Sequence, residues 1–261
     1  MSHPDATSAQ PSRSAPVPGR ARVGSMMRRA LRGAGMALLL GLGAPAALAQ
    51  GERGVVVELF TSQGCVACPP ADALMARLAQ RPGVIALSLH VDIWDYLGWV
   101  DPFADPAFTR RQKAYARASG SRSIFTPQMI VGGVHKLAAP RGMDVADLVM
   151  SEAARPDRVH LTLRRTGETL RISVEADPPL EAEMRIDLVR YTPHATVLIE
   201  AGENAGLEVT QHNIVTLWQE LTRWDGTSPL TLEVRIEGDE PAVVIVQEHG
   251  PGQIFAARHA P

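Results

Sequence analysis

The feature that most constrains this chain is a C-x-x-C pair, Cys65 and Cys68, set between a short apolar run and a helical pattern. Residues 55–60 (VVVELF) are β-branched and apolar, which predicts a short buried strand. Pro69 and Pro70 follow the second cysteine, and proline is tolerated in the first turn of a helix. The order of strand, turn, cysteine pair and helix is typical of a redox-active site.

The position of the pair explains its expected chemistry. A thiolate, not a thiol, attacks a disulfide. Free backbone N–H groups and the positive end of the dipole stabilise an anion at a helix N-terminus, so a cysteine there has a lowered pKa. We therefore expect Cys65 to be the exposed attacking sulfur and Cys68 to be the resolving one.

Other interpretations of the two cysteines remain open. A disulfide across four residues constrains the unfolded chain little, so a structural staple gains only roughly 2 kcal/mol from loop entropy. A closed zinc site usually needs four ligands, and the chain holds two cysteines in all. Two free thiols without a role, or copper handling by the two sulfurs and a loop histidine, complete the alternatives.

Residues 1–49 resemble an export signal. Arg28 and Arg29 precede a short apolar segment, residues 36–48, and an A-x-A cleavage site ends at Ala49. The apolar segment is too short, and too interrupted by Gly and Pro, to span a membrane; the alternative is a buried core helix. We predict cleavage near Ala49, a mature protein without a stable membrane span, and a periplasmic or secreted location where disulfides persist.

The charge distribution limits the class of partner. Formal net charge is -2, but the first 49 residues hold six arginines and one acid, so the remainder is distinctly acidic. An acidic surface argues against nucleic acid or an anionic membrane as partner. The expected partner is a protein or a small thiol or disulfide, and the chemistry of the motif requires no cofactor and no metal.

The segment after the cysteines predicts alternating helices and strands. Helices are expected at residues 71–80, 107–118 and 143–154, and strands at residues 84–90, 128–131 and 134–137.

Residues 90–106 (HVDIWDYLGWVDPFADP) are aromatic and acidic and predict a long ordered loop. This loop follows the carboxyl end of a strand, where ligands bind in open α/β sheets. Trp94 and Trp99 in the loop, with Thr126 further along, are the candidate substrate-binding residues. Its polar residues, His90, Asp92 and Asp95, either hold a metal or substrate or form an internal hydrogen-bonded network.

The pattern changes at Arg155-Pro156-Asp157, which we take as a domain boundary. Short alternating strands without helices follow, and they predict a β-sandwich over residues 157–261. Strands at residues 184–191 and 196–200 are expected to form a pair around Pro193 and His194. This domain would present a partner or substrate to the redox site, or merely stabilise the fold.

Four motifs together resemble a bacterial family of secreted proteins of unknown function. They are ELFTSQGC..CPPAD (residues 58–72), HVD.WDY.GW.DPF (residues 90–103), TPQM.V.G (residues 126–132) and GENAG (residues 202–206). The resemblance implies a thioredoxin-like α/β domain at residues 50–156, followed by the all-β sandwich-like domain at residues 157–261.

Similarity to thioredoxin-like enzymes implies roles for single residues. Cys65 is the nucleophile, Cys68 the resolving thiol and Pro127 a cis-proline beside them. The sequence departs from such enzymes at Gly64, where they usually have Trp, and at Val66-Ala67, which offers no charge to stabilise a thiolate.

Glu58 lies on the strand that leads to the motif, and it is the candidate proton acceptor for Cys68. The alternative is a polar residue at a sheet end. The sequence thus predicts an exported thiol–disulfide oxidoreductase. The alternatives are a non-catalytic interaction protein with a structural disulfide, and a copper-handling protein.

Overall fold

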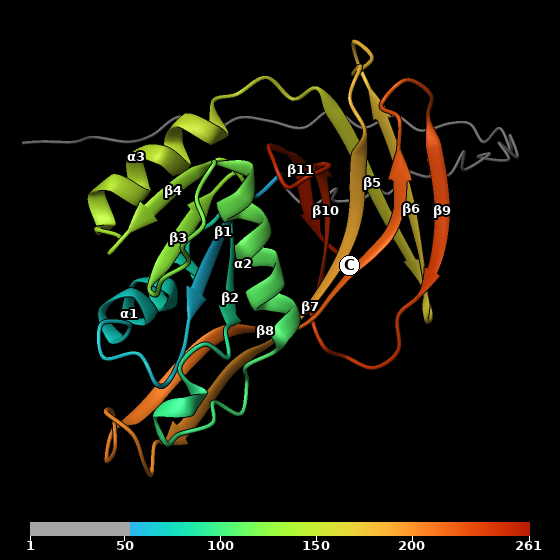
Figure 1. Cartoon of the computed structure of the whole chain (residues 1–261). Helices are drawn as coiled ribbons and strands as arrows, with labels where there is room; N and C mark the ends of the chain where they lie inside the picture. The colour runs from blue at the N-terminus through green and yellow to red at the C-terminus, as the bar shows by residue number, and fades with distance from the viewer. Residues whose placement is uncertain (1–52) are drawn as a thin grey trace, which may run out of the picture. The chain divides into compact units, whose positions relative to one another are not determined.

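The computed structural model describes residues 53–261, so the predicted leader and its cleavage site lie outside the described residues. Eleven strands form the framework of this part of the chain (Figure 1). They are β1 (Val55–Thr61), β2 (Val84–His90), β3 (Gln128–Val131), β4 (His135–Ala138), β5 (Val159–Thr166), β6 (Thr169–Ala176), β7 (Met184–Leu198), β8 (Glu208–Trp224), β9 (Leu230–Arg235), β10 (Ala242–Glu248) and β11 (Ile254–His259).

Three α-helices and one short 3₁₀ helix join the early strands. None of these helices in residues 53–261 is long and apolar enough to cross a membrane. The predicted bounds are confirmed to within two residues at each helix end. The helices are α1 (Pro69–Leu78), η1 (Asp95–Leu97), α2 (Pro106–Ala118) and α3 (Gly142–Ala153).

The strands form a mixed α/β fold with two sheets. The larger sheet has the order β11-β10-β7-β8-β2-β1-β3-β4, and the smaller, antiparallel sheet has the order β5-β6-β9. β1 and β2 run parallel, while β3 and β4 form an antiparallel hairpin at the edge of the larger sheet. The carboxyl ends of β1 and β2 therefore meet at one edge, from which the cysteine segment and the long aromatic loop both leave.

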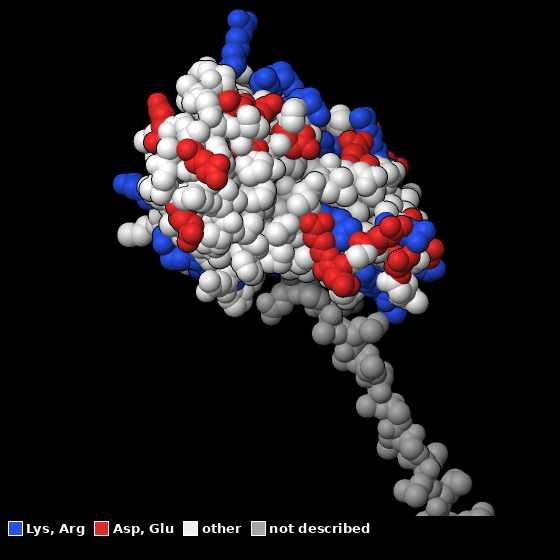
Figure 2. All heavy atoms as spheres, turned by 90° about the horizontal axis from the view of Figure 1, so that it is seen from below, with Lys and Arg blue, Asp and Glu red and all other residues white. Residues whose placement is uncertain are grey.

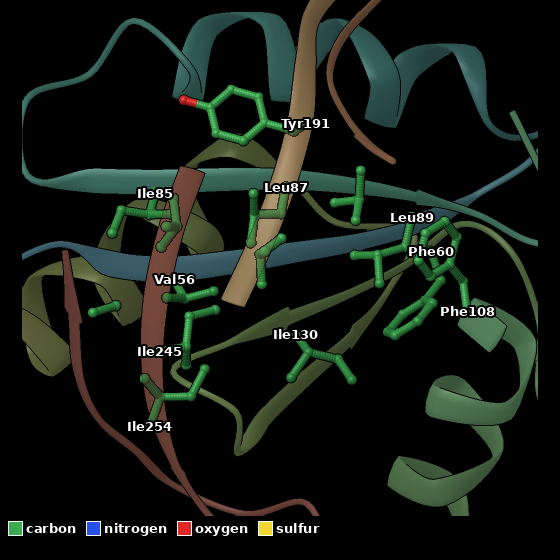
Figure 3. Packing of buried hydrophobic residues seen from close by; sticks show 14 of the residues in the cluster. Val56, Phe60, Ile85, Leu87, Leu89, Phe108, Ile130, Tyr191, Ile245 and Ile254 are labelled. Carbon is green, nitrogen blue, oxygen red and sulfur yellow. The ribbon is translucent and has the colours of Figure 1, made fainter. Parts of the chain in front are cut away.

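Strand β1 serves two cores because side chains alternate between the faces of a sheet. Val57 and Leu59 pack in the cluster that α1 and α3 cover. Val56 and Phe60 point to the opposite face, where they pack in a cluster that includes Phe108 and Tyr115 of α2 (Figure 3). The whole strand is buried, as its apolar sequence predicts.

The larger sheet unites the two segments that the sequence analysis separated at residue 156. β2 pairs with β8 in parallel at Ser88 and Ile214. Side chains extend this short junction: Ser88 Oγ donates to the carbonyl of His212 at 2.8 Å, and Asn213 Nδ2 donates to the carbonyl of Ala86 at 2.9 Å. Figure 3 shows Ile245 and Ile254 from the end of the chain packing in one cluster with Val56 of β1.

The strands after residue 157 do form two layers. Leu161, Ile172 and Leu170 of the smaller sheet pack in one cluster with Ile186 of β7 and Val244 of β10. The second layer is thus the far half of the larger sheet, not a separate sheet. The proposed division at residues 156 and 157 therefore divides the sequence but not the sheet.

One prediction for this region is wrong. Residues 184–191 and 196–200 do not form two strands around a turn, because β7 runs continuously from Met184 to Leu198. Proline cannot donate a ladder hydrogen bond. The strand accommodates Pro193 through a register shift after Arg190 and through Asn213 of β8, whose φ is 48°.

A buried ion pair connects three elements of the larger sheet and α2. Arg111 of α2 donates through Nε to Glu58 Oε2 at 2.6 Å and through Nη2 to Glu58 Oε1 at 3.0 Å. Tyr115 donates its hydroxyl to Glu58 at 2.6 Å, and Arg111 also donates to Gln247 of β10 at 3.0 Å. The Arg111 guanidinium lies over the ring of Trp218 on β8, 3.5 Å from its centroid. These contacts tie both ends of the chain together.

Replacing Glu58 with Gln is expected to lower the free energy of unfolding by about 3–5 kcal/mol, because it leaves a buried guanidinium without its counter-charge. The measurement is urea denaturation of the purified protein. The double variant Glu58→Leu/Arg111→Met should lose less than Glu58→Gln, because it removes both charges. Asp144→Asn, which breaks the exposed pair with Arg141, is the control and should leave the midpoint nearly unchanged. A similar midpoint for Glu58→Gln and Asp144→Asn would contradict the structural role.

Candidate functional site

The cysteine pair lies between β1 and α1, as its spacing predicts. Cys65 and Cys68 form a disulfide, and Cys68 is the N-cap residue of α1, with Pro69 and Pro70 in the first turn. Backbone N–H groups of Ala71 and Asp72 donate to the carbonyl of Cys68. The sulfur pair thus stands at the positive end of a ten-residue helix.

The expectation that Cys65 is exposed is wrong. Its relative exposure is 4%, and that of Cys68 is 0%. Val66, between them, is 58% exposed, so the backbone of the motif turns its two middle side chains outward and its sulfurs inward. Of the two cysteines, Cys65 is the one that retains a small solvent exposure.

Thr126 and Pro127 lie at the end of β1 beside the start of the cysteine segment. The Thr126–Pro127 bond is cis, as expected. Gln128 pairs with Phe60 in the antiparallel register of β3 and β1, which places Pro127 opposite the next residue, Thr61. The structure therefore brings Pro127 to the edge from which the cysteine segment departs.

The loop at residues 91–105 packs against the same segment. Trp94 Nε1 donates to Thr126 Oγ1 at 2.7 Å, and its Cβ lies 2.9 Å from the position that a Cβ on Gly64 would occupy. Trp99 Nε1 donates to Gln63 Oε1 at 2.8 Å. The small residue at position 64, where the sequence departs from thioredoxin-like enzymes, thus makes room for Trp94. Both indoles thus donate to side chains of the segments that flank the cysteine pair.

The polar residues of this loop form an internal hydrogen-bonded network, which is one of the two arrangements that the sequence predicts for them. His90 Nδ1 and Asp101 Oδ2 are 2.7 Å apart, and both side chains are fully buried. Asp101 also accepts from the backbone N–H of Gln63 at 2.8 Å, while Asp92 accepts from Thr109 at 2.5 Å. No group of three or more His, Cys, Asp or Glu residues within residues 53–261 has the geometry to hold a metal ion.

A third segment, the tip between β7 and β8, completes the site, and sequence reasoning did not assign it a role. Asn204 Nδ2 donates to the carbonyls of Gln63 at 2.8 Å and Cys65 at 3.1 Å. Gln63 Nε2 donates to Gln211 Oε1 at 3.1 Å. Gly202 has a φ of 78°, and a Cβ added at this position would lie only 3.1 Å from the Cβ of Trp99. The available signal was the GENAG segment, which was used only as part of the resemblance.

An acid lies on the inner side of the cysteine pair. Asp72 is four residues after Cys68, so the two share one face of α1. Thr61 Oγ1 donates to Asp72 Oδ1 at 2.8 Å. Burial raises the pKa of Asp72 to about 6, although the charge of His90 and the hydrogen bond from Thr61 lower it and Asp101 raises it. His90 also presents a buried Nε2 without a partner among the described residues.

The proposed role of Glu58 as proton acceptor does not fit its position. Glu58 shares a face of β1 with Val56 and Phe60, on the α2 side, whereas Thr61 and Asp72 lie on the α1 side. Arg111 and Tyr115 already occupy both oxygens of Glu58. Because α1 packs on the opposite face of the sheet, Asp72, one helical turn after Cys68, lies on the same side of the sheet as the cysteine pair.

Apolar side chains surround the outer face of the site. Tyr96 and Val100 in the loop are 77% and 69% exposed, and Tyr96 stacks on Trp94 with ring centroids 6.5 Å apart. Phe125, next to Thr126, is also exposed. Figure 2 shows the molecule from below the view of Figure 1; on its left half, residues other than Lys, Arg, Asp and Glu predominate, with acidic side chains among them and basic ones at the edge. The surface suits an apolar chain segment better than an anion.

Three comparisons place the chain among known proteins. The family model described as "Protein of unknown function (DUF1223)" matches residues 56–247. The crystal structure of protein AGR_C_4864 from Agrobacterium tumefaciens is 28% identical, with a TM-score of 0.67 over 79% of this chain and 93% of that chain. HBP35 of Porphyromonas gingivalis is 15% identical, with a TM-score of 0.58 over 80% of this chain and 74% of that chain, and this likeness concerns the fold alone. No curated protein matches the chain.

The raised pKa of Asp72 predicts a pH dependence of stability. The folded protein binds the proton more tightly than the unfolded chain, so this stabilisation is complete below about pH 4 and disappears as the pH rises through about 6. Two pKa units correspond to roughly 3 kcal/mol. Asp72→Asn should therefore flatten the fall in unfolding free energy between about pH 4 and 6. Asp147→Asn on α3, an exposed acid, should keep the slope of the wild type, and an unchanged slope in Asp72→Asn would exclude this titration.

Asn204→Ala should loosen the cysteine segment, because it leaves the buried Gln63 carbonyl without a donor and removes one of the two donors to the Cys65 carbonyl. The expected loss is about 1–3 kcal/mol of unfolding free energy, with faster amide hydrogen exchange at residues 63–68. The neighbouring exposed Glu203→Ala is the control and should change neither quantity. Equal exchange rates in the two variants would show that the tip does not hold the segment.

Proposed function

Because the chain belongs to the family of proteins of unknown function DUF1223, we propose its function from its own geometry: it is a thiol–disulfide oxidoreductase. The observation that carries the proposal is a disulfide at the N-terminus of α1, in which Cys65 keeps a small solvent exposure and Cys68 is fully buried. This asymmetry supports an attacking role for Cys65 and a resolving role for Cys68.

The surrounding elements support a thioredoxin-like architecture for the first part of the chain. β1 leads into the cysteine pair and α1, β2 runs parallel to β1, and a cis-proline precedes the β3–β4 hairpin. The basic and apolar pattern of residues 1–49, which lie outside the described residues, supports export to the periplasm or the medium.

The proposed reaction is a reversible exchange of disulfides. In the reduced protein, the Cys65 thiolate attacks a substrate disulfide, forms a mixed disulfide and releases one substrate thiolate. The Cys68 thiolate then attacks Cys65, restores the Cys65–Cys68 bond and releases the second substrate thiolate. Asp72 accepts the proton that Cys68 loses. The reverse sequence oxidises a substrate dithiol, so the same atoms serve either direction.

The apolar surface around the site supports a polypeptide as substrate. Val66 projects from the motif itself, and Tyr96 and Val100 project from the adjoining loop. A docking chain can bury these side chains while it approaches Cys65. Because residue Cys65 is only 4% exposed and the adjacent Val66 is 58% exposed, such a chain would contact Val66 as it approaches the disulfide.

A second candidate is a non-catalytic interaction protein in which the disulfide is a structural clip. The observation that favours it is the burial of both sulfurs. The two functions differ in how the bond responds to a redox buffer. An oxidoreductase should equilibrate with glutathione without losing its fold, whereas a structural disulfide resists the glutathione pool.

Single cysteine variants test the proposed order of the two sulfurs. With a peptide that contains one disulfide, Cys68→Ser should accumulate a mixed disulfide at Cys65, because no second thiol resolves it. Cys65→Ser should abolish turnover and form no such adduct under the same conditions. Mass spectrometry of the trapped species identifies the sulfur that reacted.

Circular dichroism of both variants establishes that they remain folded. The proposal fails if neither variant alters exchange in a folded protein, or if the adducts form on Cys68 in Cys65→Ser and none form on Cys65.

A further inference from the structure

A cavity of about 290 Å³ lies on the opposite side of the larger sheet from the cysteine pair. Its walls come from the first three turns of α2 and from β7 and β8, which Figure 1 shows close to the N-terminal end of that helix. Phe108, Ala114 and Trp218 supply apolar walls. Ligand pockets usually measure about 300–1,000 Å³, so this cavity suits a molecule of about one ring.

Three arginines converge on the cavity. Arg111 is more than nine-tenths buried, and it uses Nε and Nη2 for Glu58, Tyr115 and Gln247, while its Nη1 makes no hydrogen bond to any residue within 53–261. Arg185 likewise uses Nη2 for Asp187. Its Nε forms a long ion pair with Glu220 Oε2 at 3.8 Å, and neither Nε nor Nη1 has a hydrogen-bond partner in the same part of the chain.

Arg110 is the third arginine of the cavity. It is exposed and forms no ion pair with another described residue. The three guanidinium groups thus bring N–H donors without hydrogen-bond partners to one cavity that also has apolar walls.

The acids of the cavity satisfy only part of these donors. Asp187 Oδ2 accepts from Arg185 at 2.7 Å and from Trp218 Nε1 at 2.9 Å, while its buried Oδ1 has no hydrogen-bond partner among the described residues. Glu220 accepts from Arg223, a residue outside the cavity, at 3.1 Å, and its Oε2 lies 3.8 Å from Arg185 Nε. The unpaired N–H groups of the three arginines therefore still outnumber the one unpaired carboxylate oxygen. Planar guanidinium edges match the two oxygens of a carboxylate.

We propose that this cavity binds a small organic carboxylate, with its flat apolar body against Phe108 and Trp218 and its carboxylate toward Arg110, Arg111 and Arg185. Arg111 covers one face of the Trp218 indole, so Glu58 behind it fixes both the guanidinium and the ring. The site uses neither cysteine, and it stands independently of the proposed redox activity.

The test compares benzoate with benzamide, a neutral molecule of the same shape, at constant ionic strength. The indole N–H signal of Trp218 in a ¹H–¹⁵N spectrum, identified by Trp218→Phe, reports binding at this place. Benzoate in the millimolar range should shift that signal and leave those of Trp94 and Trp99 unchanged. The affinity for benzamide should be lower than that for benzoate by roughly tenfold or more. The reason is that a hydrogen bond between a guanidinium and a carboxylate is stronger than one between a guanidinium and a neutral amide.

Two exposed arginines of α2 provide matched variants. Arg110→Gln should weaken benzoate binding roughly tenfold, whereas Arg117→Gln, which removes the same charge outside the cavity, should leave it unchanged. Both substitutions are at the surface and preserve the fold. The proposal is overturned if Trp218 does not respond to benzoate, if benzamide binds equally well, or if the two variants weaken binding equally.

Discussion

The fold depends on the groups that neutralise and hydrogen-bond the buried guanidinium of Arg111. Arg111 would be costly inside a sheet protein without a counter-charge. Glu58 of β1 supplies that charge, Tyr115 and Gln247 complete the hydrogen bonds, and Trp218 covers the guanidinium. These groups come from the first strand, α2, β8 and β10, so the early and late parts of the chain cannot separate without leaving polar groups unpaired. The larger sheet accordingly contains strands from both the early and the late parts of the chain.

The same interdependence governs the cysteine segment. Its backbone carbonyls are held by Asn204 from the β7–β8 tip, and its Gln63 side chain is held by Trp99 and Gln211. A short loop between a strand and a helix would otherwise be mobile. The site therefore needs a segment that lies about 140 residues away in the sequence. The β-rich part of the chain therefore stabilises the segment that carries the disulfide, through the hydrogen bonds that Asn204 donates to it.

Local features of the fold follow from the sequence, and distant partnerships do not. The apolar run before Cys65, the two prolines after it and the alternating pattern of later strands predict elements to within a few residues, because each depends on nearby side chains. Strand alternation even places Glu58 on the face opposite Thr61. Which helix covers which face is a tertiary property, so the partner of Glu58 and the role of Asn204 were not accessible.

Electrostatics at the N-terminus of α1 connects the disulfide to the acid beneath it. A helix N-terminus carries only about half a positive charge, so it cannot stabilise two adjacent anions fully. After reduction, a thiolate of Cys68 and a carboxylate of Asp72 would share one face of the first turns, where like charges repel each other. The raised pKa of Asp72 keeps a proton available there in the neutral-to-acid range. His90, paired with Asp101, lies near enough to oppose that shift. Reduction of the disulfide should therefore raise the proton affinity of Asp72, because a Cys68 thiolate would add a negative charge beside its carboxylate.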